Sequence, residues 1–236
     1  MSRPVLSIAQ LALERGRNDQ VFRIDVPKLE LMPGEIVAIV GPSGCGKSTL
    51  LETIGLLLDA RHAERFFIDD IDIRASMGLS QAKREALWAR IRQHGLGFVP
   101  QTGGLLPFLN VWQNICLPVQ MSGGNAVDPI VHLLIRRLNL ETLLSRMPRE
   151  LSIGERQRVS FVRSLARRPT LLLADEPTAA LDPGLSQELF ALIVEIARQE
   201  NIATLIVTHE WDLVGQFSLP SLKGQAESVG RVVFNA

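Results

Sequence analysis

A glycine-rich stretch, GPSGCGKST (41–49), constrains the fold of this chain more than any other feature. The apolar run EIVAIV (35–40) comes directly before it and is typical of a buried parallel strand. The segment from Lys47 to Leu58 has helical character. A strand, a glycine-rich loop and a helix in this order form a cradle for phosphate, because backbone N–H groups and the positive end of the helix face one point. This context predicts a phosphate-binding loop rather than a chance glycine-rich turn.

The residue types in the loop fit phosphate chemistry. The spacing G-x-x-x-x-G-K-[ST] is met by Gly41, Gly46, Lys47 and Ser48. The glycines let backbone N–H groups curl round a β-phosphate, Lys47 neutralises β and γ oxygens, and the Ser48 hydroxyl can ligate Mg²⁺. We expect Thr49 to reach the α-phosphate.

Cys45, inside this loop, has two interpretations. Its place beside a lysine at a helix start is typical of a reactive thiol. It can instead be a small residue that fills the loop, and we favour this second interpretation.

The rest of the chain alternates between strands and helices. TLLLAD (170–175) and ATLIVTH (203–209) predict buried strands, and a helix with Asp182 as N-cap and Pro183 at its first position lies between them. This alternation indicates an α/β protein with a parallel sheet. Other expected elements are a β-hairpin or adjacent strands at 4–13 and 21–31 joined by ERGRND, strands in RFFIDDIDI and GLGFVP, a helix over 80–93 with Ser80 as N-cap, mostly helical structure over 103–150, and strands near 219–223 and 229–234.

The composition excludes several classes of function. The 236 residues include 25 basic and 25 acidic side chains, so no positive excess supports a nucleic-acid surface. We find no secretion signal and no apolar run near the roughly 18 residues that cross a bilayer. We expect a soluble protein that can dock on membrane proteins. The two cysteines, Cys45 and Cys116, are too few for a disulfide framework and indicate a reducing compartment.

Two further segments carry candidate site residues. LLLADEP ends a buried strand with Asp175, which can hold Mg²⁺ through water, and Glu176, which can polarise a water for attack on a γ-phosphate. By itself, this acidic pair could equally be a helix N-cap. LSIGERQR (151–158) contains the capping-box spacing Ser152–Glu155, yet Gly154 lies in the first turn, where glycine weakens a helix by roughly 1 kcal/mol.

Five segments together resemble one known family. They are the loop at 41–49, FVPQ, LSIGERQR, LLLADEPTAALD and IVTH, in this order. Over residues 5–215 the chain resembles the ATPase subunit of ATP-binding cassette (ABC) systems. The resemblance implies an α/β P-loop core with an N-terminal antiparallel β part, a single domain over 1–236 and an inserted helical subdomain at about 102–165. It also implies a dimer in which ATP, with Mg²⁺, lies between the phosphate loop of one subunit and the LSIGERQR segment of the other.

The resemblance assigns the ATP contacts residue by residue. The contacts within one subunit are Gly41, Pro42, Ser43, Gly44, Cys45, Gly46, Lys47, Ser48 and Thr49. The contacts from the other subunit are Ser152, Gly154 and Asp182, and Asp182 crosses the dimer interface.

The resemblance also assigns catalysis and metal binding. Glu176 matches the catalytic base and His209 the switch histidine near the γ-phosphate. Gln101 matches the glutamine that contacts Mg²⁺ or the attacking water and transmits motion to a membrane partner. Ser48, Gln101 and Asp175 are therefore the expected metal-binding residues.

Longer stretches are similar to the lipoprotein-release, macrolide-exporter and cell-division (FtsE-like) ATPases. In that subgroup Leu105, Leu106, Phe108 and Leu109 help to form a groove for a membrane partner; the other interpretation is that they belong to the core. The expected function is an ATPase, peripheral at the cytoplasmic face of the inner membrane, that powers a transporter or extrusion complex whose permease is a separate chain. The alternatives are an FtsE-like regulator without transport and a soluble ABC ATPase acting on DNA or ribosomes, which the absence of a second cassette and of a heptad run disfavours.

Three features depart from the family pattern. No tyrosine is available to stack on adenine; the matching position falls near Glu14 or Arg15, and the alternatives for stacking are the Arg15 guanidinium and Phe22. The family usually has glycine where this chain has Ile153, so we expect reduced or partner-dependent hydrolysis, or a side chain that packs outward without effect. The segment after His209 also differs, and its role is open.

Overall fold

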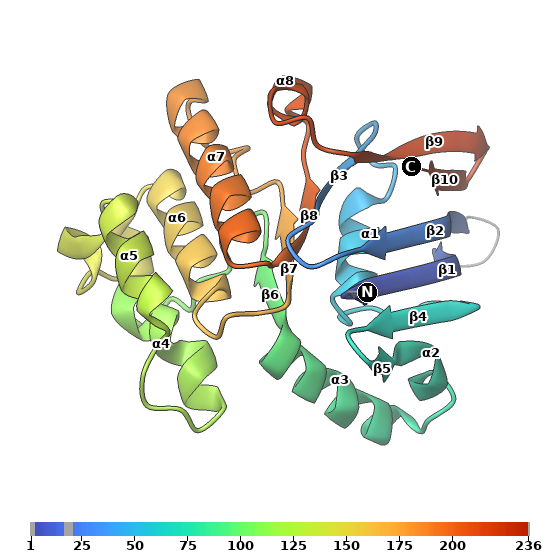
Figure 1. Cartoon of the computed structure of the whole chain (residues 1–236), viewed down its shortest axis with the longest axis horizontal. Helices are drawn as coiled ribbons and strands as arrows, with labels where there is room; N and C mark the ends of the chain where they lie inside the picture. The colour runs from blue at the N-terminus through green and yellow to red at the C-terminus, as the bar shows by residue number, and fades with distance from the viewer. Residues whose placement is uncertain (1–2, 17–20, 236) are drawn as a thin grey trace.

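The computed structural model describes residues 3–16 and 21–235. In Figure 1 a long twisted sheet crosses the molecule, with helices on both of its faces. The sheet has 10 strands in the order β5-β4-β1-β2-β10-β9-β3-β8-β7-β6. The strands are β1 (Leu6–Arg15), β2 (Phe22–Leu31), β3 (Ile36–Val40), β4 (Arg65–Ile68), β5 (Ile71–Asp72), β6 (Leu96–Val99), β7 (Leu171–Asp175), β8 (Ala203–Val207), β9 (Ser221–Ser228) and β10 (Arg231–Asn235).

The helices connect these strands. They are α1 (Lys47–Ile54), α2 (Ile73–Ser76), α3 (Gln81–Gly95), α4 (Val111–Met121), α5 (Pro129–Arg137), α6 (Ile153–Ser164), α7 (Pro183–Gln199) and α8 (Trp211–Gln216), with short 3₁₀ turns at Glu141–Leu143 and Pro148–Glu150.

The sheet has a parallel part and an antiparallel part. Strands β9, β3, β8, β7 and β6 pair in parallel, which confirms the α/β core. Strands β1 and β2 pair antiparallel, and β4 joins β1 antiparallel, which confirms the N-terminal β part. Positions 17–19 of the predicted turn lie outside the described residues.

The central strands are buried on both faces. On β7, Leu171 and Leu173 belong to one apolar cluster, whereas Leu172 and Ala174 belong to the other. Alternate side chains of a strand point to opposite faces, so these strands serve two cores. This is why their sequences are continuous apolar runs rather than alternating ones.

Helices α4, α5 and α6 pack together on one side of the sheet and form the left part of the molecule in Figure 1. They fall inside the predicted subdomain at about 102–165, whose boundaries stay a prediction, as does the single domain over 1–236.

Two local predictions were wrong in part. The helix after the phosphate loop ends at Ile54 rather than Leu58, because Leu56 adopts a left-handed backbone with φ 57°. Ser80 occupies the N-cap position of α3, but its side chain makes no capping hydrogen bond.

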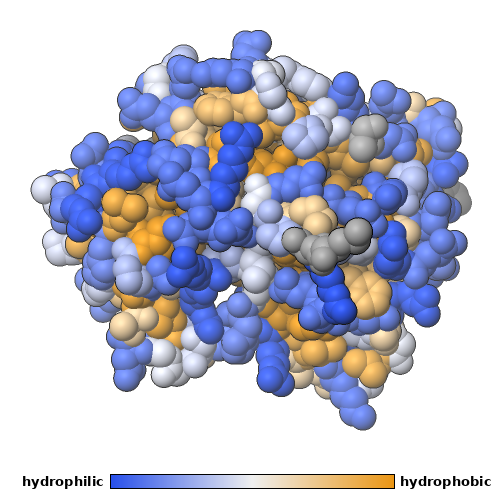
Figure 2. Space-filling model, in the orientation of Figure 1, coloured by the Kyte–Doolittle hydropathy of each residue, from blue (hydrophilic) through white to orange (hydrophobic). Residues whose placement is uncertain are grey.

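The face of the molecule in Figure 2 is mostly hydrophilic, with separate apolar patches. Among the described residues, Phe108 and Met121 are each 71% exposed. Within 3–16 and 21–235, no helix combines the length and the apolar character that crossing a membrane requires.

Gly97 on β6 lies close to the end of α6, and a substitution there tests this packing. A Cβ there would lie 2.6 Å from the Ser164 carbonyl oxygen and 2.9 Å from Pro169 Cγ. We expect Gly97→Ala to lower the free energy of unfolding by about 1–3 kcal/mol, measured in urea, since backbone must shift. The control is Gly215→Ala in α8, where nothing lies within 4 Å and alanine favours the helix. Equal stability of the two variants would contradict this packing argument.

Candidate functional site

The glycine-rich loop joins the end of β3 to the start of α1. Its glycines Gly41, Gly44 and Gly46 have φ of 155°, 76° and 94°. A Cβ on Gly46 would lie 2.3 Å from Ile24 Cδ1, whereas nothing lies within 4 Å of one on Gly44. The left-handed conformation and the close approach to β2 both require glycine at 46. The loop therefore turns by backbone alone, as a phosphate cradle needs.

Lys47 lies over this loop. Its ammonium donates hydrogen bonds to the carbonyl oxygens of Gly41 and Pro42, each at 3.0 Å, and the residue is 5% exposed. An ammonium has three N–H donors, so one remains for an anion. Cys45 is 7% exposed and belongs to the core, which agrees with its interpretation as a filling residue. These features fit a bound phosphate chain.

Ser48 and Asp175 meet although they lie far apart in the sequence. The Ser48 hydroxyl donates to Asp175 Oδ1 at 3.0 Å. Asp175 ends β7 and is 7% exposed. Burial raises the pKa of Asp175, the Ser48 hydrogen bond opposes this, and Glu176 adds to it. The Ser48 hydroxyl and the Asp175 carboxylate are oxygen ligands of the kind that suit Mg²⁺, which takes a few protein oxygens together with phosphate oxygens and water.

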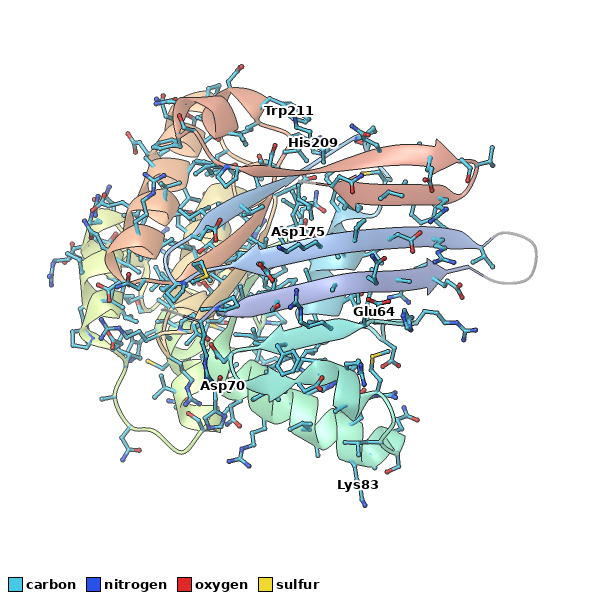
Figure 3. The ribbon with its side chains drawn as sticks, turned by 45° about the vertical axis from the view of Figure 1, so that its right-hand side comes forward. Glu64, Asp70, Lys83, Asp175, His209 and Trp211 are labelled. Carbon is cyan, nitrogen blue, oxygen red and sulfur yellow. The ribbon has the colours of Figure 1, made fainter. Side chains whose placement is uncertain are left out.

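Glu176 connects the other catalytic candidates. Its Oε2 accepts from Gln101 Nε2 at 3.2 Å, and its Oε1 lies 3.1 Å from His209 Nε2. Its backbone has φ 46° and its N–H donates to the Val207 carbonyl at 2.9 Å. Asp175 is the last residue of β7, and His209 lies two residues past the end of the neighbouring strand β8; both are labelled in Figure 3. The structure thus brings Gln101, Glu176 and His209 together beside the Ser48–Asp175 pair.

The LSIGERQR segment forms the predicted capping box at the start of α6. The Ser152 hydroxyl accepts from the Glu155 N–H at 3.2 Å, and the Ser152 N–H donates to Glu155 Oε2 at 2.7 Å. This bond to the backbone of Ser152 lowers the pKa of Glu155. A Cβ on Gly154 would lie 2.5 Å from Leu181 Cδ2, while the Ile153 side chain is 56% exposed. The close approach of Leu181, in the segment before Asp182, therefore gives a second explanation for glycine at position 154, one that lies within the same chain.

Asp182 caps α7 as predicted. Its carboxylate accepts the N–H groups of Gly184 and Leu185, both at 3.1 Å. Among the described residues, no hydrogen bond joins Ser152, Gly154 or Asp182 to the phosphate loop of the same chain.

A family model described as "ABC transporter" matches residues 24–179. The chain belongs to the ABC transporter family. The lipoprotein-releasing system ATP-binding protein LolD of Ruegeria sp. is 41% identical over 190 residues, 80% of each chain. The protein of the same name from Granulibacter bethesdensis is 40% identical over 214 residues, 89% of this chain and 90% of that one.

A solved structure of an ATP-binding cassette has a similar fold. A dimeric post-hydrolysis structure of the ATP-binding cassette MJ0796 bound to ADP and Pi has a TM-score of 0.80 at 27% identity, covering 96% of both chains. This ABC protein is the ATP-binding and ATP-hydrolysing subunit of a transporter, and it resembles the lipoprotein-release subgroup.

Sequence reasoning missed Gln157, which positions Gln101 in this ABC ATPase. Gln157 is 1% exposed, and its Nε2 donates to the Gln101 carbonyl, while its Oε1 has no partner among the residues that the structure describes. Its polar side chain among buried positions of α6 was the available signal. It links the LSIGERQR helix to the segment of Gln101.

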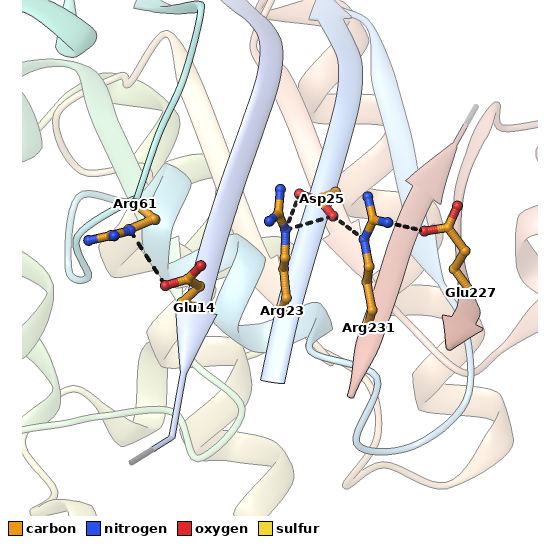
Figure 4. Close-up of polar contacts among 6 residues, drawn as sticks. All are labelled: Glu14, Arg23, Asp25, Arg61, Glu227 and Arg231. Carbon is orange, nitrogen blue, oxygen red and sulfur yellow. Dashed lines mark hydrogen bonds and ion pairs between the residues drawn. The ribbon is translucent and has the colours of Figure 1, made fainter. Parts of the chain in front are cut away.

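Glu14, at the expected adenine position, and Phe22, one of the stacking alternatives, differ in their contacts. Glu14 pairs with Arg61 at 3.5 Å (Figure 4), and Phe22 Cε1 lies 3.2 Å from a Cβ on Gly46. Phe22 therefore lies beside the glycine-rich loop. Which residue stacks on adenine stays a prediction. Of the four proposed groove residues, Leu105 packs on the core, and Phe108 is largely exposed.

Asp175 allows a test of the site's electrostatics. Because burial raises its pKa above the ordinary 3.8, the folded state binds this proton more tightly than the unfolded chain, and stability falls as pH rises from 3.8 through the raised pKa. Asp175→Asn removes this loss and still accepts the Ser48 hydrogen bond. Without nucleotide, we expect its urea midpoint to exceed that of the parent at neutral pH, with the difference shrinking toward acid pH. Asp212→Asn, on an exposed aspartate, is the control, and a lower midpoint for Asp175→Asn would refute the argument.

Proposed function

We propose that this ATPase powers a lipoprotein-releasing type of transporter through a catalytic group made of Glu176, Gln101 and His209. The observation that carries this proposal is the Glu176 carboxylate held between Gln101 Nε2 and His209 Nε2. Both carboxylate oxygens have partners, so the orientation of the group is set. The names of the relatives support lipoprotein release rather than signalling without transport.

The residues divide the work of phosphoryl transfer. The backbone of the glycine-rich loop and Lys47 hold the phosphates. Ser48 and Asp175, with Gln101 beside them, are the residues that would hold Mg²⁺, which when bound would supply neutralisation of charge on the phosphate oxygens. Glu176 orients the attacking water and accepts its proton, while His209 contacts the transferred phosphate.

The proposed dimer completes the site with Ser152, Gly154 and Asp182 of the second subunit. In the capping box the Ser152 hydroxyl acts as an acceptor, so its own O–H stays available to donate to a phosphate oxygen. Capping and ATP contact therefore do not compete. The N-terminus of α6 adds its positive end.

The proposal also names the partners of the ATPase and its location in the cell. The ATPase works as a homodimer or pseudo-dimer on permease subunits of a separate chain, at the cytoplasmic face of the inner membrane, and it does not act on nucleic acid. The names of the relatives and the balanced charge support this.

Glu176→Gln tests the base. We expect turnover to fall at least about 100-fold, since the amide cannot take the proton, with ATP binding kept and an ATP-bound dimer that persists in size-exclusion chromatography. Glu188→Gln, on the exposed face of α7, is the matched control. Hydrolysis at the parental rate would remove Glu176 from this role.

Ile153→Gly tests the unusual signature. The exposed Ile153 side chain stands at the helix start that is proposed to meet the ATP of the second subunit, so we expect its removal to increase ATP turnover severalfold. Leu133→Gly in α5 controls for the loss of helix propensity, because Leu133 is also exposed. Unchanged dimerisation and turnover would mean that Ile153 packs outward without effect.

A further inference from the structure

Arg163, near the end of α6, is a cation that the catalytic proposal leaves without a role. Its guanidinium donates to two successive backbone carbonyls, from Nη1 to Gly104 at 2.8 Å and from Nη2 to Gly103 at 3.1 Å. Burial lowers the pKa of Arg163, and within the described residues no carboxylate forms an ion pair with it. An arginine stays charged even so, because its ordinary pKa is far above neutral. The structure therefore uses this partly buried cation to hold backbone.

The backbone that Arg163 holds has an unusual conformation. Gly103 and Gly104 are both left-handed, with φ of 75° and 56°. A Cβ on Gly104 would lie 2.8 Å from Pro100 Cγ, and one on Gly103 would lie 3.3 Å from the Arg156 carbonyl oxygen. Residues with side chains adopt this conformation only at a cost, and here they would also meet close neighbours. The two glycines thus give the chain a shape in which one guanidinium reaches both carbonyls.

A second side chain of α6 holds the same segment. We call residues 100–104, which follow β6, the Gln101 loop. Gln157 donates to the Gln101 carbonyl, so Gln157 and Arg163 together bind three carbonyls of this loop. On the other side of the loop backbone, Gln101 Nε2 donates to Glu176 Oε2 at 3.2 Å. A continuous set of hydrogen bonds and covalent backbone therefore joins α6 to the proposed catalytic base.

We propose that Arg163 is a positioning residue for ATP hydrolysis, which fixes the Gln101 loop so that the Gln101 side chain stays on Glu176. This proposal rests on the proposed catalytic group. The planar guanidinium donates two N–H groups in a fixed geometry, whereas the ammonium of a lysine is a single point of charge. Hydrolysis should therefore require arginine at position 163 and not only a positive charge.

The first test measures the loop itself and needs no ATP. Hydrogen–deuterium exchange of the full chain, followed by mass spectrometry, should show severalfold faster exchange of the backbone N–H groups of the Gln101 loop in Arg163→Lys. The matched control is Arg158→Lys, on the same helix, because Arg158 donates to the Leu138 carbonyl at 2.9 Å, outside the loop. Unchanged exchange of the loop in Arg163→Lys would overturn the proposal, whatever the outcome for the proposed function.

The second test is a double-mutant cycle on turnover. We expect Arg163→Lys to lower kcat about tenfold or more, with little change in KM for ATP, because the glycine-rich loop is intact. In a Gln101→Ala background, Arg163→Lys should cause no further loss, since it acts through Gln101. A further loss of the same size in that background would overturn the proposal. If Gln101→Ala alone hydrolyses ATP at the parental rate, Gln101 has no place in the proposed catalytic group, and the role of Arg163 fails with it.

A third variant reaches the loop without changing Arg163. We expect Gly104→Ala to lower kcat as Arg163→Lys does, because its Cβ would press on Pro100 and move the carbonyls. Gly123→Ala is the matched control, since Gly123 is also left-handed, with φ 77°, and nothing lies within 4 Å of a Cβ there. Equal kcat values for these two alanine variants would contradict the positioning role.

Discussion

The parallel pairing of β7 with β8 sets the geometry of every catalytic candidate. Asp175 stands opposite Val207 in this register, and the Glu176 N–H donates to the Val207 carbonyl. His209 follows Val207 by two residues, just past the end of β8. Because β3 also pairs in parallel with β8, the glycine-rich loop leaves the sheet at the same end, where Ser48 reaches Asp175. A change in this register would separate the acid, the histidine and the loop.

The site combines a rigid support with local strain. The strands below it are buried on both faces, so they cannot shift without disturbing two cores. Glu176 adopts a left-handed backbone that costs a side-chain-bearing residue of order 1 kcal/mol or more. The hydrogen bond to Val207 holds this conformation, in which the carboxylate contacts Gln101 and His209.

Features that depend on neighbouring residues were predictable from the sequence. The glycine-rich loop, the capping box of Ser152 and Glu155, and the Asp182 cap each involve groups within a few positions. The family resemblance added Gln101 and His209, which are distant in the sequence.

Contacts between distant segments were not predictable. The bond from Gln157 to Gln101 and the bond from Ser186 to Glu210 depend on how helices pack on the sheet, which no local pattern encodes. The early end of α1 follows from the left-handed Leu56 rather than from helix propensity.

The segment after His209, which differs from the family pattern, holds the two parts of the sheet together. Strand β10 pairs with β2 and β9 pairs with β3, so the hydrogen-bonded path from the antiparallel part to the parallel part runs through them. Asp25 on β2 strengthens the junction by accepting from Arg231 on β10 at 2.7 Å. Within the described residues, the antiparallel part and the parallel part are joined as one sheet only through the strands of residues 221–235.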